Sequence, residues 1–175
     1  VPTTLLAMVD SSLGGKVAVN LSVGKNIVGL FHQPRMVVSD VRFLETLPDG
    51  EFRNGLSEAL KHALIGEPST MGILERNDPA SIRNESVAAD LVAHSVLFKT
   101  GVVERDEKEN DLRAILNFGH TIGHAIESHL GYRGVSHGEA VAAGMRVKAE
   151  ISRRLGLLTD GEAGLVKGLI ARYGL

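Results

Sequence analysis

The feature that most constrains the fold is a helical repeat of apolar residues that begins after Pro48 and continues along the chain. Leu56 and Leu60 mark one face of the first predicted helix, which starts near residues 49–51. Further helices are predicted after Pro68, over 86 to about 103, from near 117 to 130, over 138–155 and after 159. Gly131 and Gly156 follow two of them, at positions where glycine commonly ends a helix. The pattern predicts a mainly α-helical protein.

The first forty-odd residues have a different pattern. Short runs rich in β-branched residues, 16–20 and 36–40, are separated by Gly24 and Gly29, which predicts short strands and loops. We therefore expect a mainly α fold with a small α/β piece at its N-terminal end. The predicted boundary divides the chain into residues 1–48 and a helical domain of residues 49–175.

Composition excludes several classes of function. The 175 residues carry a net charge of −2 and no basic arm, so the chain does not resemble a nucleic-acid-binding protein. No uninterrupted apolar run reaches the roughly 20 residues that span a bilayer, so no membrane partner is expected. The chain has no cysteine, which excludes disulfides and thiolate metal sites and fits a reducing cytoplasm.

Three histidines form the most informative cluster. His120 and His124 are four residues apart and project from one helix face, and His137 stands at the start of the following helix. Thr121 follows His120, so this is not the metalloprotease motif, which has a glutamate there. Neutral imidazoles with one carboxylate suit Zn²⁺. Spacing alone leaves open which histidines bind the metal and which carboxylate completes the set.

The surroundings of this cluster also carry information. Gly119 and Gly123 flank the histidines at helical spacing, and a glycine inside a helix indicates that something packs or binds closely there. The other histidines have no comparable neighbours and are interpreted as structural or surface residues: His32, His62, His94 and His129.

Cationic side chains suggest a multiply anionic ligand. The run 10–16 ends in Gly14, Gly15 and Lys16, but it is not a P-loop because Asp10 stands where that motif has a glycine. Glu58 and Lys61 share a helix face, and such a pair is commonly a surface ion pair, although this helix is otherwise strongly apolar. If the cations of these segments converge, they would hold carboxylate or phosphate. They are Lys16, Lys25, Lys61, Lys99 and Arg113.

Motifs along nearly the whole chain resemble, in the same order, those of the 3-dehydroquinate synthase family. They occupy residues 2–7, 9–16, 24–26, 43–48, 55–61, 104–107, 112–127 and 137–142, together with Lys99. The resemblance implies a helical metal-binding domain and a carbon–oxygen lyase of the shikimate pathway to aromatic amino acids. This family converts a seven-carbon sugar-acid phosphate, DAHP, into 3-dehydroquinate and phosphate. It uses NAD⁺ and a divalent metal, usually Zn²⁺, with Co²⁺ as the other candidate.

The resemblance also implies roles for individual residues. Glu58, His120 and His137 would bind the metal, which assigns His124 to the substrate phosphate instead. The implied substrate contacts are Lys16, Asn26, Lys61, Lys99, Arg113, Asn117 and His124. The implied NAD contacts are Thr3, Thr4, Asp10, Lys16, Lys25, Phe43 and Thr46.

The chain departs from the family pattern in two respects. Val17 replaces a threonine that commonly follows the Gly-Gly-Lys motif. The family also has a preceding nucleotide-binding half and terminal helices that residues 1–175 do not contain. We therefore expect a fragment, with residues 1–48 as the remainder of the nucleotide-binding domain and a helical domain truncated at its C-terminal end. The family resemblance further implies a homodimer in the full-length enzyme.

Other functions stay open at this point. Inosose and valiolone synthases, which are also sugar-phosphate cyclases, share the metal and NAD chemistry. Iron-dependent alcohol dehydrogenases have a related fold, but their site uses more histidines and an aspartate, and the segment around Glu58 argues against them. A metal-binding or interaction module without catalytic activity, or a truncated remnant of the synthase, is the remaining alternative.

Overall fold

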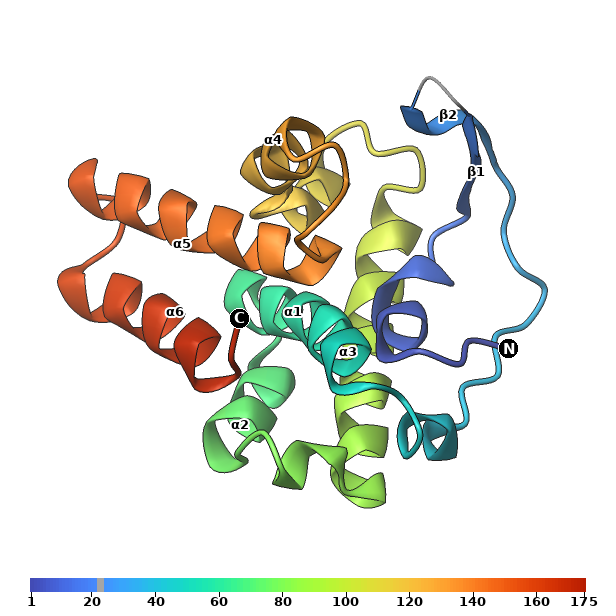
Figure 1. The fold of residues 1–175 in the computed structure, drawn as a ribbon, viewed down its shortest axis with the longest axis horizontal. Helices are drawn as coiled ribbons and strands as arrows, with labels where there is room; N and C mark the ends of the chain where they lie inside the picture. The colour runs from blue at the N-terminus through green and yellow to red at the C-terminus, as the bar shows by residue number, and fades with distance from the viewer. Residues whose placement is uncertain (22–23) are drawn as a thin grey trace.

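A computed structural model describes residues 1–21 and 24–175 of the chain (Figure 1). Its long helices are α1 (Asp49–Ile65), α2 (Pro68–Arg76), α3 (Glu85–Arg105), α4 (His120–His129), α5 (His137–Arg154) and α6 (Asp160–Arg172). Its strands are β1 (Lys16–Leu21) and β2 (Gly24–Phe31). Short helical turns are η1 (Ala7–Ser11), η2 (Val41–Leu44), η3 (Ser81–Arg83) and η4 (Leu112–Asn117). The predicted fold class, mainly helical with a small strand-containing N-terminal piece, is confirmed.

Capping residues explain where two of the helices begin. The hydroxyl of Ser136 accepts a hydrogen bond from the backbone of Glu139 at the start of α5, and the Glu139 side chain accepts in return. Thr159 and Glu162 form the same capping box at the start of α6. Gly156, with φ of +72°, follows the end of α5, as the sequence predicted.

The strand prediction is partly wrong. Strand β1 pairs with β2 in an antiparallel hairpin in which Lys16 lies opposite Phe31. Gly24 and Gly29, predicted to lie between strands, are both part of β2. Residues 36–40, predicted as a strand, have no regular structure. A strand requires a partner for its backbone hydrogen bonds. Strand β1 pairs with residues 24–31, which are nearer in the sequence than residues 36–40.

Helix α1 lies at the centre of the helical body, where it contacts α2, α3, α5 and α6 (Figure 1). Its residues from Gly55 to Ala63 are all buried, so both its apolar and its polar side chains face other elements. Leu56 and Leu60 belong to the hydrophobic core, together with residues of every other long helix except α4. A polar side chain on the buried part of α1 must therefore find its partners inside the protein.

Helix α3 bears on the expectation that the chain has no membrane partner. By length and composition alone it is long and apolar enough to cross a bilayer. The core helix of a soluble protein meets the same test, so this is weak evidence. Here Ala88, Leu91 and Val92 of α3 lie in the hydrophobic core, and Lys99 of the same helix is buried beside polar groups. In this structure one face of α3 packs in the core, and 39% of its apolar window is buried.

The start of α4 differs from the prediction. The chain forms η4 up to Asn117 and then turns at Gly119, whose φ of +83° is left-handed, so α4 begins at His120 instead of near residue 117. A Cβ on Gly119 would lie 2.6 Å from the carbonyl oxygen of Val141 in α5. Gly119 is thus the N-cap of α4, at a close crossing of α4 and α5. Of Gly119 and Gly123, only Gly123 lies inside the helix.

Candidate metal centre

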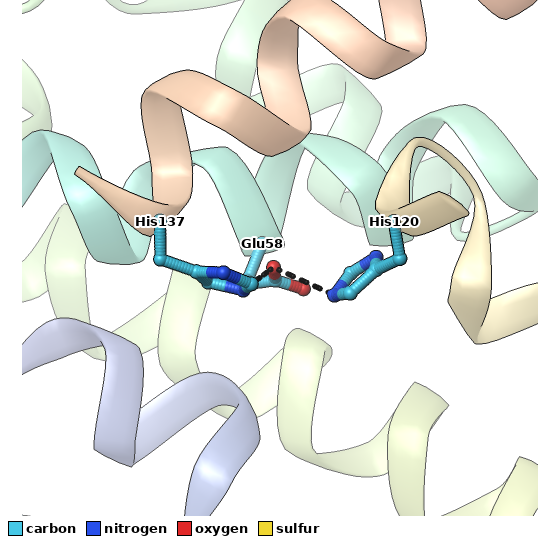
Figure 2. A group of neighbouring side chains, drawn as sticks. All are labelled: Glu58, His120 and His137. Atoms are coloured by element: carbon cyan, nitrogen blue, oxygen red, sulfur yellow. Dashed lines mark ion pairs between the residues drawn. The ribbon is translucent and has the colours of Figure 1, made fainter. Parts of the chain in front are cut away.

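Three helices bring Glu58, His120 and His137 together (Figure 2). Glu58 projects from the buried middle of α1, and each histidine is the first residue of its helix. Oxygen Oε1 of Glu58 lies 3.5 Å from Nε2 of His120 and 3.5 Å from Nε2 of His137. The candidate ligand atoms of the three residues all lie within 4.8 Å of one another, so these residues could hold one metal ion.

The contact between α1 and α5 explains how His137 reaches Glu58. The backbone N–H of Gly138 donates to Oδ1 of Asn54 at 2.6 Å. A Cβ on Gly138 would lie 2.7 Å from both Cα of Asn54 and Oγ of Ser57. Because only glycine permits this approach, the first turn of α5 rests on α1 and places His137 beside Glu58.

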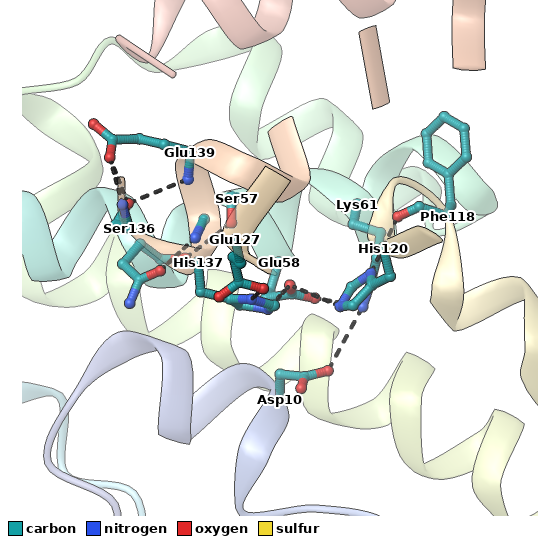
Figure 3. Close-up of polar contacts among 12 residues, drawn as sticks. Asp10, Ser57, Glu58, Lys61, Phe118, His120, Glu127, Ser136, His137 and Glu139 are labelled. Atoms are coloured by element: carbon teal, nitrogen blue, oxygen red, sulfur yellow. Dashed lines mark hydrogen bonds and ion pairs between the residues drawn. The ribbon is translucent and has the colours of Figure 1, made fainter. Parts of the chain in front are cut away.

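A buried ionic cluster adjoins the three residues (Figure 3). The ammonium of Lys61 forms an ion pair with Oε2 of Glu58 and lies 3.7 Å from Oδ1 of Asp10. The ammonium of Lys99 lies 2.8 Å from the same Asp10 oxygen and donates to the Asp10 carbonyl at 2.6 Å. Two of the predicted substrate lysines therefore converge, and the Glu58–Lys61 pair is buried instead of lying on the surface.

The charges of the cluster favour an ionised Glu58. Burial opposes its ionisation, but Lys61, His137 and His120 outweigh that effect and hold the pKa of Glu58 well below its ordinary value. The contact with Glu58 raises the pKa of His137, while burial lowers the pKa of His120. Burial also lowers the pKa of Lys99, against the opposing effect of Asp10.

The donor set fits a divalent metal. Both carboxylate oxygens of Glu58 are buried and have no hydrogen-bond partner among the described residues, which is costly unless a cation compensates. Lys61 compensates at Oε2, so Oε1 stays directed at the two imidazoles. Two imidazole nitrogens and one carboxylate oxygen are a ligand set of catalytic zinc sites that leaves further positions open.

His124 lies beside the cluster on the next turn of α4. Its ring centroid is 5.4 Å from that of His120 and 5.9 Å from that of His137. His124 and His137 line a cleft of about 430 Å³ together with Asp10, Asn26 and other residues. Of the predicted substrate residues, His124 and Asn26 thus face the same cleft.

Other predicted substrate residues contact different partners. Arg113 is buried and its guanidinium donates to the carbonyl oxygen of Gly14 at 2.8 Å. Lys16 forms an ion pair with Glu109, and the amide of Asn117 donates to Glu109 at 2.6 Å. These contacts connect the start of β1 with the segment before α4, and a role toward substrate stays a prediction for all three.

The predicted NAD residues lie in the N-terminal segment and around η2. The hydroxyl of Thr4 accepts a hydrogen bond from the backbone of Ala7 at the start of η1. Thr3, Phe43 and Thr46 are exposed. The side chain of Lys25 is outside the described part of the structure.

Two side chains at the centre were not singled out from the sequence. Nδ1 of His137 lies 3.3 Å from a carboxylate oxygen of Glu127, which is buried on α4. His62, interpreted as structural or surface, is fully buried, with Nε2 3.8 Å from Asp10. Helical spacing could have revealed both, because Glu127 is three residues after His124 and His62 is four after Glu58.

Family models extend the picture to the whole chain. Residues 1–54 match the model of the 3-dehydroquinate synthase N-terminal region, and residues 55–175 match that of its C-terminal region. The chain belongs to the 3-dehydroquinate synthase family. The division between the two matches falls inside α1, a few residues after the boundary predicted at residue 48.

Curated members of the family are close in sequence. The 3-dehydroquinate synthase of Nitrosospira multiformis is 47% identical over 100% of this chain and 48% of its own length. That of Teredinibacter turnerae is 51% identical over 100% of this chain and 49% of its own length. The chain thus spans about half the length of these relatives.

Solved structures of related enzymes share the fold. Two structures of 2-deoxy-scyllo-inosose synthase cover 99% of this chain, with TM-scores of 0.89 and 0.86 and identities of 35% and 34%. One of them is complexed with carbaglucose-6-phosphate, NAD⁺ and Co²⁺. A 2-epi-5-epi-valiolone synthase from Streptomyces hygroscopicus with NAD⁺ and Zn²⁺ bound has a TM-score of 0.85 and 30% identity over 99% of this chain. This chain covers 48%, 47% and 50% of the three structures, respectively.

Proposed function

We propose that this chain is the catalytic, metal-binding portion of a 3-dehydroquinate synthase. The proposed reaction converts DAHP into 3-dehydroquinate and phosphate, which is the reaction of a carbon–oxygen lyase. The observation that carries the proposal is the buried Glu58 carboxylate facing His120 and His137 across three helices. Identity of 47% and 51% to curated 3-dehydroquinate synthases along the whole chain supports this substrate in particular.

The proposed cofactors are NAD⁺ and a divalent metal, Zn²⁺ or Co²⁺, held by Glu58, His120 and His137. When bound, NAD⁺ accepts and returns a hydride, and the metal polarises substrate oxygens as a Lewis acid. Thr3, Thr4, Asp10, Lys16, Lys25, Phe43 and Thr46 are proposed to line the NAD site. This proposal rests on the family motifs and on the NAD⁺ named for the related structures.

The chain's own cations are proposed to bind and orient the substrate. Lys61 and Lys99 meet at Asp10 inside the protein, where a desolvated ammonium attracts an anion more strongly than it does in water. His124 and Asn26 face the cleft next to His137 and are proposed to contact the substrate phosphate and hydroxyls. Lys16, Arg113 and Asn117 complete the proposed set, and their contacts join the start of β1 to the segment before α4. Orientation by several such contacts is a recognised source of catalysis.

Phosphate release from DAHP tests the proposal. The chain is incubated with DAHP, NAD⁺ and Zn²⁺, and the variants are Glu58→Ala and, as a matched control on the same helix, Glu51→Ala, whose side chain is exposed. Release that falls at least about a hundredfold in Glu58→Ala and is unchanged in Glu51→Ala supports the synthase. Zinc binding without any turnover would contradict activity of this chain alone, and no zinc binding would contradict the ligand assignment.

A second candidate is another sugar-phosphate cyclase. It is favoured by the TM-score of 0.89 with 2-deoxy-scyllo-inosose synthase. The same assay with a hexose 6-phosphate in place of DAHP distinguishes the two. Faster phosphate release from the hexose phosphate would favour this second reaction.

The proposal extends to the organisation and location of the protein. Residues 1–48 are proposed to belong with a nucleotide-binding domain and residues 49–175 to form the metal- and substrate-binding domain. A homodimer in the cytoplasm is the proposed assembly, with small molecules and neither nucleic acid nor membrane as binding partners. Sedimentation of the longer protein that contains this chain would test the dimer.

A further inference from the structure

Glu127 is a buried carboxylate next to the candidate metal centre that has no role in the proposed ligand set. It lies on α4, seven residues after His120 and three after His124, on the face that carries both histidines. Its side chain is 6% exposed. A carboxylate buried to this degree indicates a specific partner, because its desolvation is otherwise unfavourable.

One partner of Glu127 is the imidazole of His137. Oxygen Oε2 of Glu127 lies 3.3 Å from Nδ1 of that ring, while Nε2 of the same ring lies 3.5 Å from Oε1 of Glu58. The ring is thus held between two carboxylates from different helices, one at each nitrogen (Figure 3). The two contacts leave the plane of the ring little freedom to turn.

The two nitrogens of this ring have different partners. A neutral imidazole has one N–H and one lone pair, and an ionised carboxylate only accepts hydrogen bonds. If a metal takes the lone pair of Nε2 between Glu58 and His120, the ring N–H is at Nδ1, where Glu127 is placed to accept it. We propose that Glu127 is the positioning residue of the metal centre, which holds the ring of His137 so that Nε2 faces the metal. This inference rests on the metal site of the proposed function.

An alternative use of the same residues is a second metal site. His124, Glu127 and His137 also have candidate ligand atoms within 4.8 Å of one another. The two uses exclude each other, because Nδ1 of His137 cannot donate a proton to Glu127 and bind a metal. Two metals on one ring would require an imidazolate anion, in which the neutral ring has lost its remaining N–H proton. The positioning role requires only the neutral ring that a zinc ligand normally supplies.

Isothermal titration calorimetry, in which zinc is added to the metal-free chain, tests the inference. We expect one zinc per chain in the wild type and affinity about 10- to 100-fold weaker in Glu127→Ala. Glu127→Gln, whose amide oxygen still accepts from Nδ1–H, should recover a large part of that loss. His129→Ala is the matched control from the same helix, because its side chain is exposed, and it should bind zinc as the wild type does. Thermal unfolding of each metal-free variant establishes that it is folded.

A second readout reports the contact between Glu127 and His137 directly. In ¹⁵N-histidine NMR of the zinc-loaded chain, the Nδ1–H of His137 should be protected from exchange with water in the wild type, because Glu127 accepts it. In Glu127→Ala that proton should exchange faster. A structural role of Glu127 in folding alone would not produce this change.

Each contrary result has a distinct meaning. Wild-type zinc affinity and unchanged exchange of the Nδ1 proton of His137 in Glu127→Ala would overturn the inference. Two zinc ions per chain, with one lost in His124→Ala, would overturn it in favour of the second metal site. Unchanged zinc binding in Glu58→Ala would instead reject the metal site of the proposed function, whatever the Glu127 variants do.

Discussion

At the scale of single residues, the metal centre depends on how burial and charge are balanced around one carboxylate. Glu58 is fully buried, and its two oxygens face different partners, the imidazoles at Oε1 and Lys61 at Oε2. Asp10 in turn offsets Lys61 and Lys99. Each of these charges is stabilised by an opposite charge beside it. Removing one side chain would leave its neighbour charged, buried and unpaired, which is destabilising.

His62 provides a prediction about pH at this scale. Burial lowers the pKa of His62 to about 4, whereas an unfolded histidine titrates near 6.5. Between these values the unfolded state binds the additional proton, so this residue costs stability as the pH falls from about 6.5 toward 4. We expect the metal-free chain to lose roughly 2–3 kcal/mol through this residue across that window, and His62→Phe not to show this part of the loss.

Urea unfolding of the metal-free protein at neutral and at mildly acidic pH measures this effect. The exposed His129, replaced by Gln, serves as the control and should retain the wild-type pH dependence. Identical pH dependence in the wild type and His62→Phe would show that His62 does not contribute.

At the scale of elements, close helix crossings place the histidines. At the crossing of α4 and α5, a Cβ on Gly144 would lie 2.0 Å from the carbonyl oxygen of Gly119, immediately before His120. Gly138, which follows His137 in the sequence, contacts Asn54 at the crossing of α1 and α5. A change of helix spacing at either glycine would therefore move a candidate ligand.

Gly144→Ala tests the first crossing. The added methyl group would meet the backbone of Gly119, which cannot move aside as a side chain can. We therefore expect the free energy of unfolding to fall by about 1–3 kcal/mol and zinc to bind more weakly. Gly101→Ala in α3 is the control, because a Cβ there meets nothing within 4 Å, and it should be neutral or stabilising by up to about 1 kcal/mol. Chemical denaturation and zinc titration measure both; an equally mild effect of the two substitutions would contradict the close crossing.

Tyr173 links the end of α6 to α2. Its buried hydroxyl lies 2.8 Å from the carbonyl oxygens of Leu74 and Asn77. Tyr173→Phe keeps the ring and removes the hydroxyl, so we expect a loss of about 1–2 kcal/mol in urea unfolding with zinc affinity unchanged. A loss of zinc affinity would indicate that this contact also maintains the metal centre.

At the scale of the whole molecule, the metal centre is a junction of three helices. Its candidate ligands come from α1, α4 and α5, so a metal bound there connects elements that lie far apart in the sequence. Binding only to the folded state stabilises that state by mass action.

Zinc should therefore raise the unfolding temperature. With free zinc at about 100 times its dissociation constant, the expected gain is about 2.7 kcal/mol, or roughly 5–10 °C for a chain of this size. Glu58→Ala should remove the shift and the exposed Glu51→Ala should retain it. Differential scanning calorimetry measures it, and equal shifts in both variants would place the zinc elsewhere.

Much of the fold could be predicted from local sequence signals. Apolar periodicity identified the long helices, and Thr159 and Gly156 marked helix ends where the structure has them, because capping depends on residues within one turn. The strand at residues 36–40 and the start of α4 near residue 117 were predicted wrongly. Strand pairing is a non-local choice, and the left-handed turn at Gly119 is selected by its contact with α5.

For the site, the sequence by itself determined the kind of chemistry: histidines on one helix face, a Glu–Lys pair on an apolar helix, and family motifs in order. Only the tertiary structure decided that Glu58 is buried, that Asp10 joins Lys61 to Lys99, and that Glu127 contacts His137. Helical periodicity places side chains within one helix. Contacts between helices depend on how the close-packed crossings at Gly138 and Gly144 bring distant segments together.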